Sequence, residues 1–236
     1  MNPDPSVSIK KSSMFHVGLK EGFTIAIGYV PIALTFGLLA KSTGLSLVEA
    51  VAMSLFVFAG AAQFMALNLI AIGTGAVEIV LATFVLNLRH LLLSATINEK
   101  SSDDPKRLKA LYAFGITDET FSVAATSGRT ITASYMAGLV TMAYSSWVVC
   151  SAAGYYAGAA LPGALRESMG IALYAMFIGL LVPSMKKHRK VVVLAGTAAL
   201  LSSFFTMFLS GGWAIVLATL VTSIGVELCW KGSERQ

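Results

Sequence analysis

The stretch FVFAGAAQF, from Phe56 to Phe64, lies within 28 consecutive uncharged residues, Ala50 to Val77. Its middle joins Gly60 to two alanines and to the amide of Gln63. A run of this length is typical of a membrane segment, where backbone groups find no water to bond. A glycine there either lets helices pack closely or interrupts the helix, and the amide needs a hydrogen-bonding partner. The segment therefore either crosses a membrane as one helix or is divided into two halves.

The composition indicates that the whole chain is membrane-embedded. Hydrophobic residues make up 56% of it and charged residues only 12%, whereas soluble domains contain about half apolar and about a quarter charged residues. Apolar stretches close to the ~20 residues that span a bilayer cover 22–40, 46–72, 76–98, 131–160, 168–185, 191–209 and 212–229. The sequence predicts an all-α, polytopic membrane protein of about six to eight membrane segments, some broken or re-entrant, in a single integral membrane domain over 1–236.

The positive charges gather at the ends of these stretches, as expected for cytoplasmic loops. They form four clusters: Lys10, Lys11 and Lys20; Lys100, Lys106, Arg107 and Lys109; Lys186, Lys187, Arg189 and Lys190; Lys231 and Arg235. We expect a multi-pass protein of the cytoplasmic (inner) membrane, with residues 1–20 and 231–236 in the cytoplasm. The net charge of +5 is therefore explained by contact with the lipid bilayer, and no nucleic acid is expected as a partner.

Cytoplasmic clusters require an even number of crossings between neighbours, yet the first two intervals each contain three apolar segments. One segment of each interval should therefore not cross. The candidates are 46–72, which Gly60 would break into two halves, and the weak stretch 108–126, interrupted by ITDET (Ile116 to Thr120). Irregular backbone at membrane depth is tolerated only inside protein or beside a wet cavity, so such breaks indicate a pathway. Plain helix packing at Gly60 is the alternative.

Two further motifs concern helix continuity and packing. Pro31, in GYVPIALTFG, removes a backbone hydrogen bond, so the helix is either kinked or discontinuous, with loosened backbone that contacts substrate as in many secondary transporters. GYYAG, from Gly154 to Gly158, is a G-x-x-x-G motif and predicts close helix contact.

The stretch LNLRHLL, Leu86 to Leu92, places a cation within an apolar segment. Counting from Ala76, Arg89 lies about 20 Å along the predicted helix. It either needs a partner or snorkels to the cytoplasmic surface. Asn87 and His90 share one polar face, and Arg89 points away from it.

The adjacent acids Asp118 and Glu119 are the expected counter-charges of this cation. They also fit the first turn of a short helix that Thr117 or Asp118 would cap. A helix N-terminus at this position could offer N–H groups to a substrate carboxylate, and a carboxylate beside it could bind an ammonium group or carry a proton.

Four stretches in this order within residues 15–127 resemble the AzlC/YgaZ family: GYVPIALTFGLLAKSTGLS, MSLFVFAGAAQFMALNL, LNLRHLLLSATI and GITDETFSVA. The resemblance implies the large subunit of a branched-chain amino acid exporter. Such a protein exports valine, leucine, isoleucine and in some cases methionine across the cytoplasmic membrane. It acts with a small membrane subunit of the AzlD/YgaH type.

A pocket for an apolar amino acid combines apolar walls with a few polar groups for the zwitterion. The residues expected to bind substrate are Pro31, Phe58, Gly60, Gln63, Phe64, Asn87 and Thr117. Those expected to form ion pairs or couple protons are Arg89, His90, Asp118 and Glu119.

The expected mechanism is secondary, gradient-driven alternating access, because the chain contains no Walker A motif. A passive channel for small amphipathic solutes is the alternative. No enzymatic activity, cofactor or metal site is expected, since the three histidines form no H-E-x-x-H motif.

Overall fold

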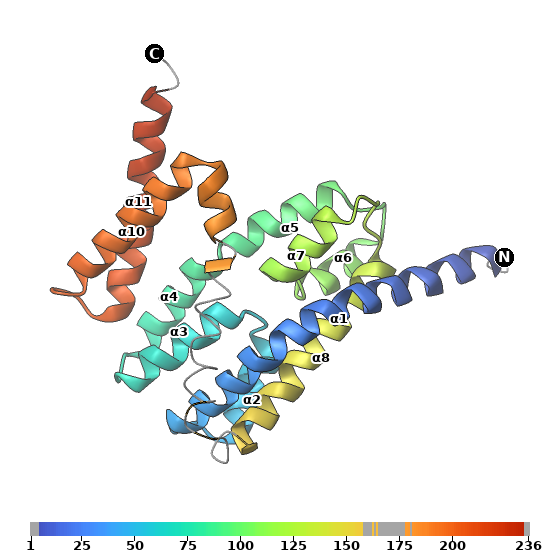
Figure 1. Ribbon diagram of the computed structural model, residues 1–236, viewed down its shortest axis with the longest axis horizontal. Coiled ribbons are helices and arrows are strands. Elements are labelled where there is room, and N and C mark those ends of the chain that lie inside the picture. Colours follow the sequence, from blue (N-terminus) through green and yellow to red (C-terminus); the bar gives the residue numbers. More distant parts are fainter. Residues whose placement is uncertain (1–4, 158–161, 163, 165–177, 180, 234–236) are drawn as a thin grey trace. The chain divides into compact units, whose positions relative to one another are not determined.

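The computed structural model describes residues 5–157, 162, 164, 178–179 and 181–233, and these contain helices and no strand. The helices, shown in Figure 1, are α1 (Pro5–Ser42), α2 (Leu47–Phe56), α3 (Gly60–Ala71), α4 (Ala76–Asn87), α5 (Arg89–Glu99), α6 (Lys106–Ala113), α7 (Asp118–Thr126), α8 (Ala133–Ala157), α10 (Arg189–Phe205) and α11 (Gly211–Ser233). Among the described residues, four helical stretches are long and apolar enough to cross a membrane: Met14–Ser42, Ala76–Glu99, Ala133–Ala157 and Gly211–Trp230. The prediction of an all-α polytopic membrane protein is confirmed.

Helices α1 and α8 lie side by side (Figure 1) and form the frame of a first compact unit, residues 1–64 and 87–169. Their contact depends on small residues. A Cβ atom added at Gly37 would overlap the Ser151 carbonyl oxygen, and one added at Gly154 would overlap that of Leu34. Five glycines of the two helices lie so close to the facing backbone that an added Cβ atom would meet it. We call them the glycine seam: Gly18, Gly22, Gly37, Gly138 and Gly154. The close contact predicted at Gly154 is confirmed, and Gly158 lies outside the described residues.

The glycine seam also gives the relative direction of α1 and α8. Gly18 meets Tyr135 and Gly37 meets Ser151, so both helices run the same way. If both cross a membrane, the chain between them must cross it an odd number of times. The stretch Ala76–Glu99 supplies one crossing, which agrees with the charge-based prediction that 46–72 and 108–126 make no net crossing.

The predicted interruption of 46–72 is present, between Phe56 and Gly60. Helices α2 and α3 have 10 and 12 residues, and at ~1.5 Å per residue neither spans a core of ~30 Å. Gly60 is the first residue of α3 and does not itself form the break.

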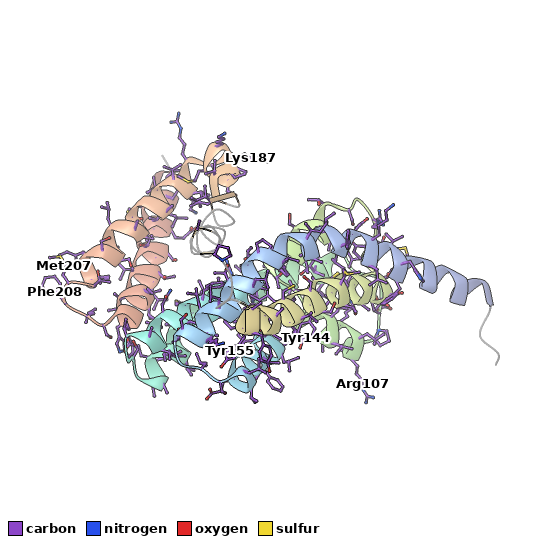
Figure 2. The ribbon with its side chains drawn as sticks, turned by 60° about the horizontal axis from the view of Figure 1, so that its bottom comes forward. Arg107, Tyr144, Tyr155, Lys187, Met207 and Phe208 are labelled. Atoms are coloured by element: carbon purple, nitrogen blue, oxygen red, sulfur yellow. The ribbon has the colours of Figure 1, made fainter. Side chains whose placement is uncertain are left out.

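Helix α2 is fixed at both ends. Ser46 caps it through a capping box with Glu49. Two tyrosines of α8, labelled in Figure 2, donate hydrogen bonds to the backbone around α2: Tyr155 to the Leu45 carbonyl at 2.9 Å and Tyr144 to the Leu55 carbonyl at 2.8 Å. The bond to Leu55 satisfies one of the last carbonyl groups of α2, which the break would otherwise leave unpaired. The bond to Leu45 holds the chain just before the helix begins.

The weak stretch 108–126 is also two helices, α6 and α7, of 8 and 9 residues. An interruption that the sequence did not predict is the turn at Leu88 between α4 and α5. Leu88 itself keeps right-handed helical angles, and its carbonyl accepts from the Leu91 N–H.

Of the two alternatives at Pro31, a kinked helix or a discontinuous one, the structure excludes the discontinuous helix. Helix α1 continues through Pro31, whose side chain is exposed. The α1 glycines of the seam contact α8 on both sides of the proline, Gly18 and Gly22 before it and Gly37 after it. Side chains also bond the nearby backbone, since Thr35 donates to the Pro31 carbonyl and Ser146 of α8 donates to that of Ala26.

A second compact unit comprises residues 65–86 and 170–236. Leu69, Ala82 and Val216 form its buried cluster, and α10 and α11 pack as a hairpin over the predicted stretches 191–209 and 212–229. Of the predicted stretch 168–185, residues 168–177 and 180 lie outside the described residues.

Glu78 of α4 caps α11, because its carboxylate accepts bonds from the Ser210 hydroxyl and, at 2.9 Å, from the Trp213 N–H. Replacing Glu78 by alanine leaves this helix end unpaired, which should lower the free energy of unfolding by about 1 kcal/mol. Thermal unfolding of the detergent-solubilised protein measures this loss. The Glu78→Gln variant keeps an acceptor oxygen, so its stability should fall less than that of Glu78→Ala. If Glu78→Ala and the wild type have the same melting temperature, Glu78 does not stabilise this helix end.

Candidate functional site

The N-terminus of α7 is closed by its own side chains. The Thr120 N–H donates to Thr117 Oγ1 at 3.3 Å, and the Thr117 N–H donates to Thr120 Oγ1 at 2.8 Å. Asp118 and Glu119 occupy the first turn, so the predicted cap at Thr117 is confirmed. The two carboxylates at this end would repel a substrate carboxylate. The sequence offered two roles for this helix end, and the structure therefore favours the one in which its carboxylates bind an ammonium group or carry a proton.

The two acids of α7 have different partners. Arg89, the first residue of α5, forms an ion pair with Asp118 at 3.0 Å, so Arg89 pairs with an acid instead of snorkelling. Glu119 instead accepts a hydrogen bond from the Tyr29 hydroxyl at 2.7 Å. Asp118 is therefore balanced by a cation, whereas a neutral phenol contacts Glu119.

Tyr29 connects α1 to this acidic end. It is 4% exposed, and its hydroxyl also lies 2.8 Å from Thr117 Oγ1. An ionised carboxylate only accepts hydrogen bonds. The phenolic proton therefore points to Glu119, and Thr117 donates its own proton to the phenolic oxygen.

The ring of Tyr29 belongs to a buried aromatic group. It packs edge-on against Trp147 of α8, with centroids 5.0 Å apart, and against Phe58, at 6.2 Å. Phe36 of α1 contacts both Trp147 and Phe64. Phe58 and Phe64, both expected to bind substrate, are thus buried, Phe58 beside Tyr29 and Phe64 beside Phe36.

The other end of the site is the first turn of α3. Trp147 Nε1 donates to Gln63 Oε1 at 2.9 Å, and Gln63 is fully buried. A Cβ at Gly60 would lie 2.7 Å from Cη2 of the same indole, so only glycine permits this approach. The indole therefore touches both Gly60 and the Gln63 amide.

The predicted residues thus form two groups on either side of the Tyr29–Trp147 pair. Thr117, Asp118, Glu119 and Arg89 form the acidic end, and Phe58, Gly60, Gln63 and Phe64 line the end at α3. His90 and Asn87 flank Arg89 and Leu88 in the chain, and Asn87 Oδ1 is buried without a bond from the described residues. Pro31 belongs to neither group, since its side chain is exposed.

Sequence reasoning missed Tyr29 and Trp147, which connect the two groups. A signal existed in each case. Tyr29 stands two residues before Pro31 in a quoted motif, and Trp147 lies mid-way along an apolar stretch. Buried tyrosine and tryptophan generally find a hydrogen-bonding partner, so both should have been sought opposite the acids and Gln63.

Comparisons with known proteins show the family of the chain. A family model described as AzlC protein matches residues 24–161, which include both broken segments. An uncharacterized membrane protein of Archaeoglobus fulgidus is 36% identical over 82% of this chain and 86% of its own. The inner membrane protein YgaZ of Escherichia coli is 30% identical over 94% of both chains.

The branched-chain amino acid transport protein AzlC of Bacillus subtilis is 23% identical over 95% of this chain and 90% of its own. No solved structure matches the chain. The chain therefore belongs to the AzlC family of membrane proteins, which is related to branched-chain amino acid transport.

Proposed function

We propose that this protein exports branched-chain and similar apolar amino acids across the cytoplasmic membrane by a secondary, gradient-driven mechanism. The observation that supports it most is the buried group in which Tyr29 and Trp147 connect the Glu119 carboxylate to the Gln63 amide. A zwitterion with an apolar side chain needs a mostly apolar pocket with a few polar groups for its charges. The printed name of the Bacillus subtilis relative supports the same substrate class.

The two broken segments suit alternating access. Helices α3 and α7 both begin within the protein beside α1 and α8, and short helices of this kind bind substrate in many secondary transporters. The mobile parts would be these short helices, while the glycine seam keeps α1 and α8 together. We further propose a small membrane subunit of the AzlD/YgaH type as partner, on the basis of family resemblance alone.

Glu119 is our candidate for the group that couples transport to a proton gradient. Asp118 is already held in an ion pair with the Arg89 guanidinium at 3.0 Å. Glu119 contacts Tyr29 and has no ion pair among the described residues, so protonating it breaks no salt bridge. A protonated Glu119 would leave a substrate ammonium group without its counter-charge and so favour release.

The experiment is efflux of preloaded radiolabelled leucine from vesicles that contain this chain, with and without a small subunit of that type. We expect saturable efflux that is accelerated by leucine on the opposite side. Flux that rises linearly with concentration and shows no counterflow would instead indicate a passive channel. If no leucine moves even with the partner present, the proposed substrate class is wrong.

A further inference from the structure

The N-terminus of α3 differs from that of α7 in having no cap. The first bond within the helix runs from the Gln63 N–H to the Ala59 carbonyl at 3.0 Å. The N–H groups of Gly60, Ala61 and Ala62 are therefore those that an α-helix leaves without an intrahelical partner. Ala59 has no side-chain oxygen to cap them, and no acid lies in the first turn.

Gln63 adds an independent observation at the same place. The indole N–H of Trp147 is only a donor, so the Gln63 atom that it contacts must be the amide oxygen. This assigns the other amide atom, Nε2, as a donor, and it is buried with no hydrogen-bonding partner. A buried donor without a partner costs about 1–3 kcal/mol, which a ligand with a free acceptor would recover.

The amide lies beside the uncapped turn. Helical side chains lean toward the N-terminus, and the indole that holds Gln63 Oε1 also lies against Gly60. The turn therefore combines unpaired N–H groups and a buried amide donor, with no anion among the residues of its first turn. Such a set of donors, at the positive end of a helix dipole, favours a negatively charged group.

We propose that this turn binds the α-carboxylate of the transported amino acid, through the backbone N–H groups of Gly60–Ala62 and through Gln63 Nε2. This inference rests on the proposed function, because it assumes that the ligand is an amino acid. The site thus selects molecules with a free carboxylate and discriminates against amides of the same amino acids.

The test is competition against radiolabelled leucine transport by unlabelled leucine and by leucinamide, at a mildly acidic pH that keeps both amines charged. Leucinamide retains the ammonium group and the side chain but has no negative charge. We expect it to inhibit on the order of 100-fold more weakly than leucine, because the charge-assisted bonds are lost. Equal inhibition by the two compounds would overturn the carboxylate site while leaving leucine transport established.

A paired variant tests the same residue directly. Gln63→Glu still offers an oxygen to Trp147 Nε1 but places a negative charge beside the turn. Leucine transport should be lost, and leucinamide should become the better of the two ligands in a binding or thermal-shift assay. Thermal unfolding with no ligand checks that the variant folds. A folded Gln63→Glu protein with the wild-type preference for leucine would overturn the proposal.

Discussion

Replacing Glu119 by glutamine is expected to abolish leucine export driven by a pH gradient, while exchange of leucine for leucine continues. Glutamine keeps the size of the side chain and an oxygen to accept the Tyr29 bond, but it cannot take up a proton. Exchange moves substrate in both directions without net proton movement, so it needs no group that titrates. Because glutamine also removes the counter-charge of the substrate ammonium group, exchange should survive with a lower apparent affinity for leucine. The measurement is efflux from vesicles with and without an imposed pH gradient, compared with leucine counterflow in the same vesicles.

Asp118→Asn is the matched control, since it removes the neighbouring carboxylate in the same turn. Its loss leaves Arg89 without its 3.0 Å partner, and an unpaired, partly buried cation is destabilising. This variant should therefore lower gradient-driven efflux and exchange together, and lower the melting temperature. Undiminished gradient-driven export by Glu119→Gln would eliminate Glu119 as the coupling group.

The sequence predicted the features that depend on local patterns. The parity of positive clusters and the composition of FVFAGAAQF indicated one break, and ITDET indicated the other; both are present. The cap at Thr117 followed from a Thr-Asp-Glu sequence whose residue types are preferred at a helix start. Pairing of Arg89 with an adjacent acid was one of two possibilities, and the structure selects Asp118.

The errors and omissions concern contacts between segments that are distant in the chain. Pro31 disfavours a helix locally, but packing along α8 overrides that preference. Tyr29 and Thr117 are 88 residues apart, and Gln63 and Trp147 are 84 apart. Each polar side chain predicts only that some partner exists. The sequence likewise does not show which of the two short helices, α3 or α7, keeps a free N-terminus for an anion. That depends on the side chains that fold back and cap α7, which only the structure shows.

The glycine seam provides the prediction with the largest effect on folding. A methyl group at Gly37 would overlap the Ser151 carbonyl oxygen and approach the Tyr155 N–H nitrogen to 2.6 Å. Both atoms are backbone and cannot move aside as a flexible side chain can, so α1 and α8 would have to separate. We expect Gly37→Ala to lower the free energy of unfolding by roughly 3 kcal/mol, with loss of leucine transport.

Gly28 offers a matched control on the same helix, because nothing lies within 4 Å of a Cβ placed there. Gly28→Ala should be neutral or stabilising by up to about 1 kcal/mol, since alanine is the better helix former. Thermal unfolding and size-exclusion profiles of the two detergent-solubilised variants give the comparison. If Gly37→Ala and Gly28→Ala have the same melting temperature, the packing of α1 against α8 does not depend on this contact. The frame that brings Tyr29 to Trp147 would then need another explanation.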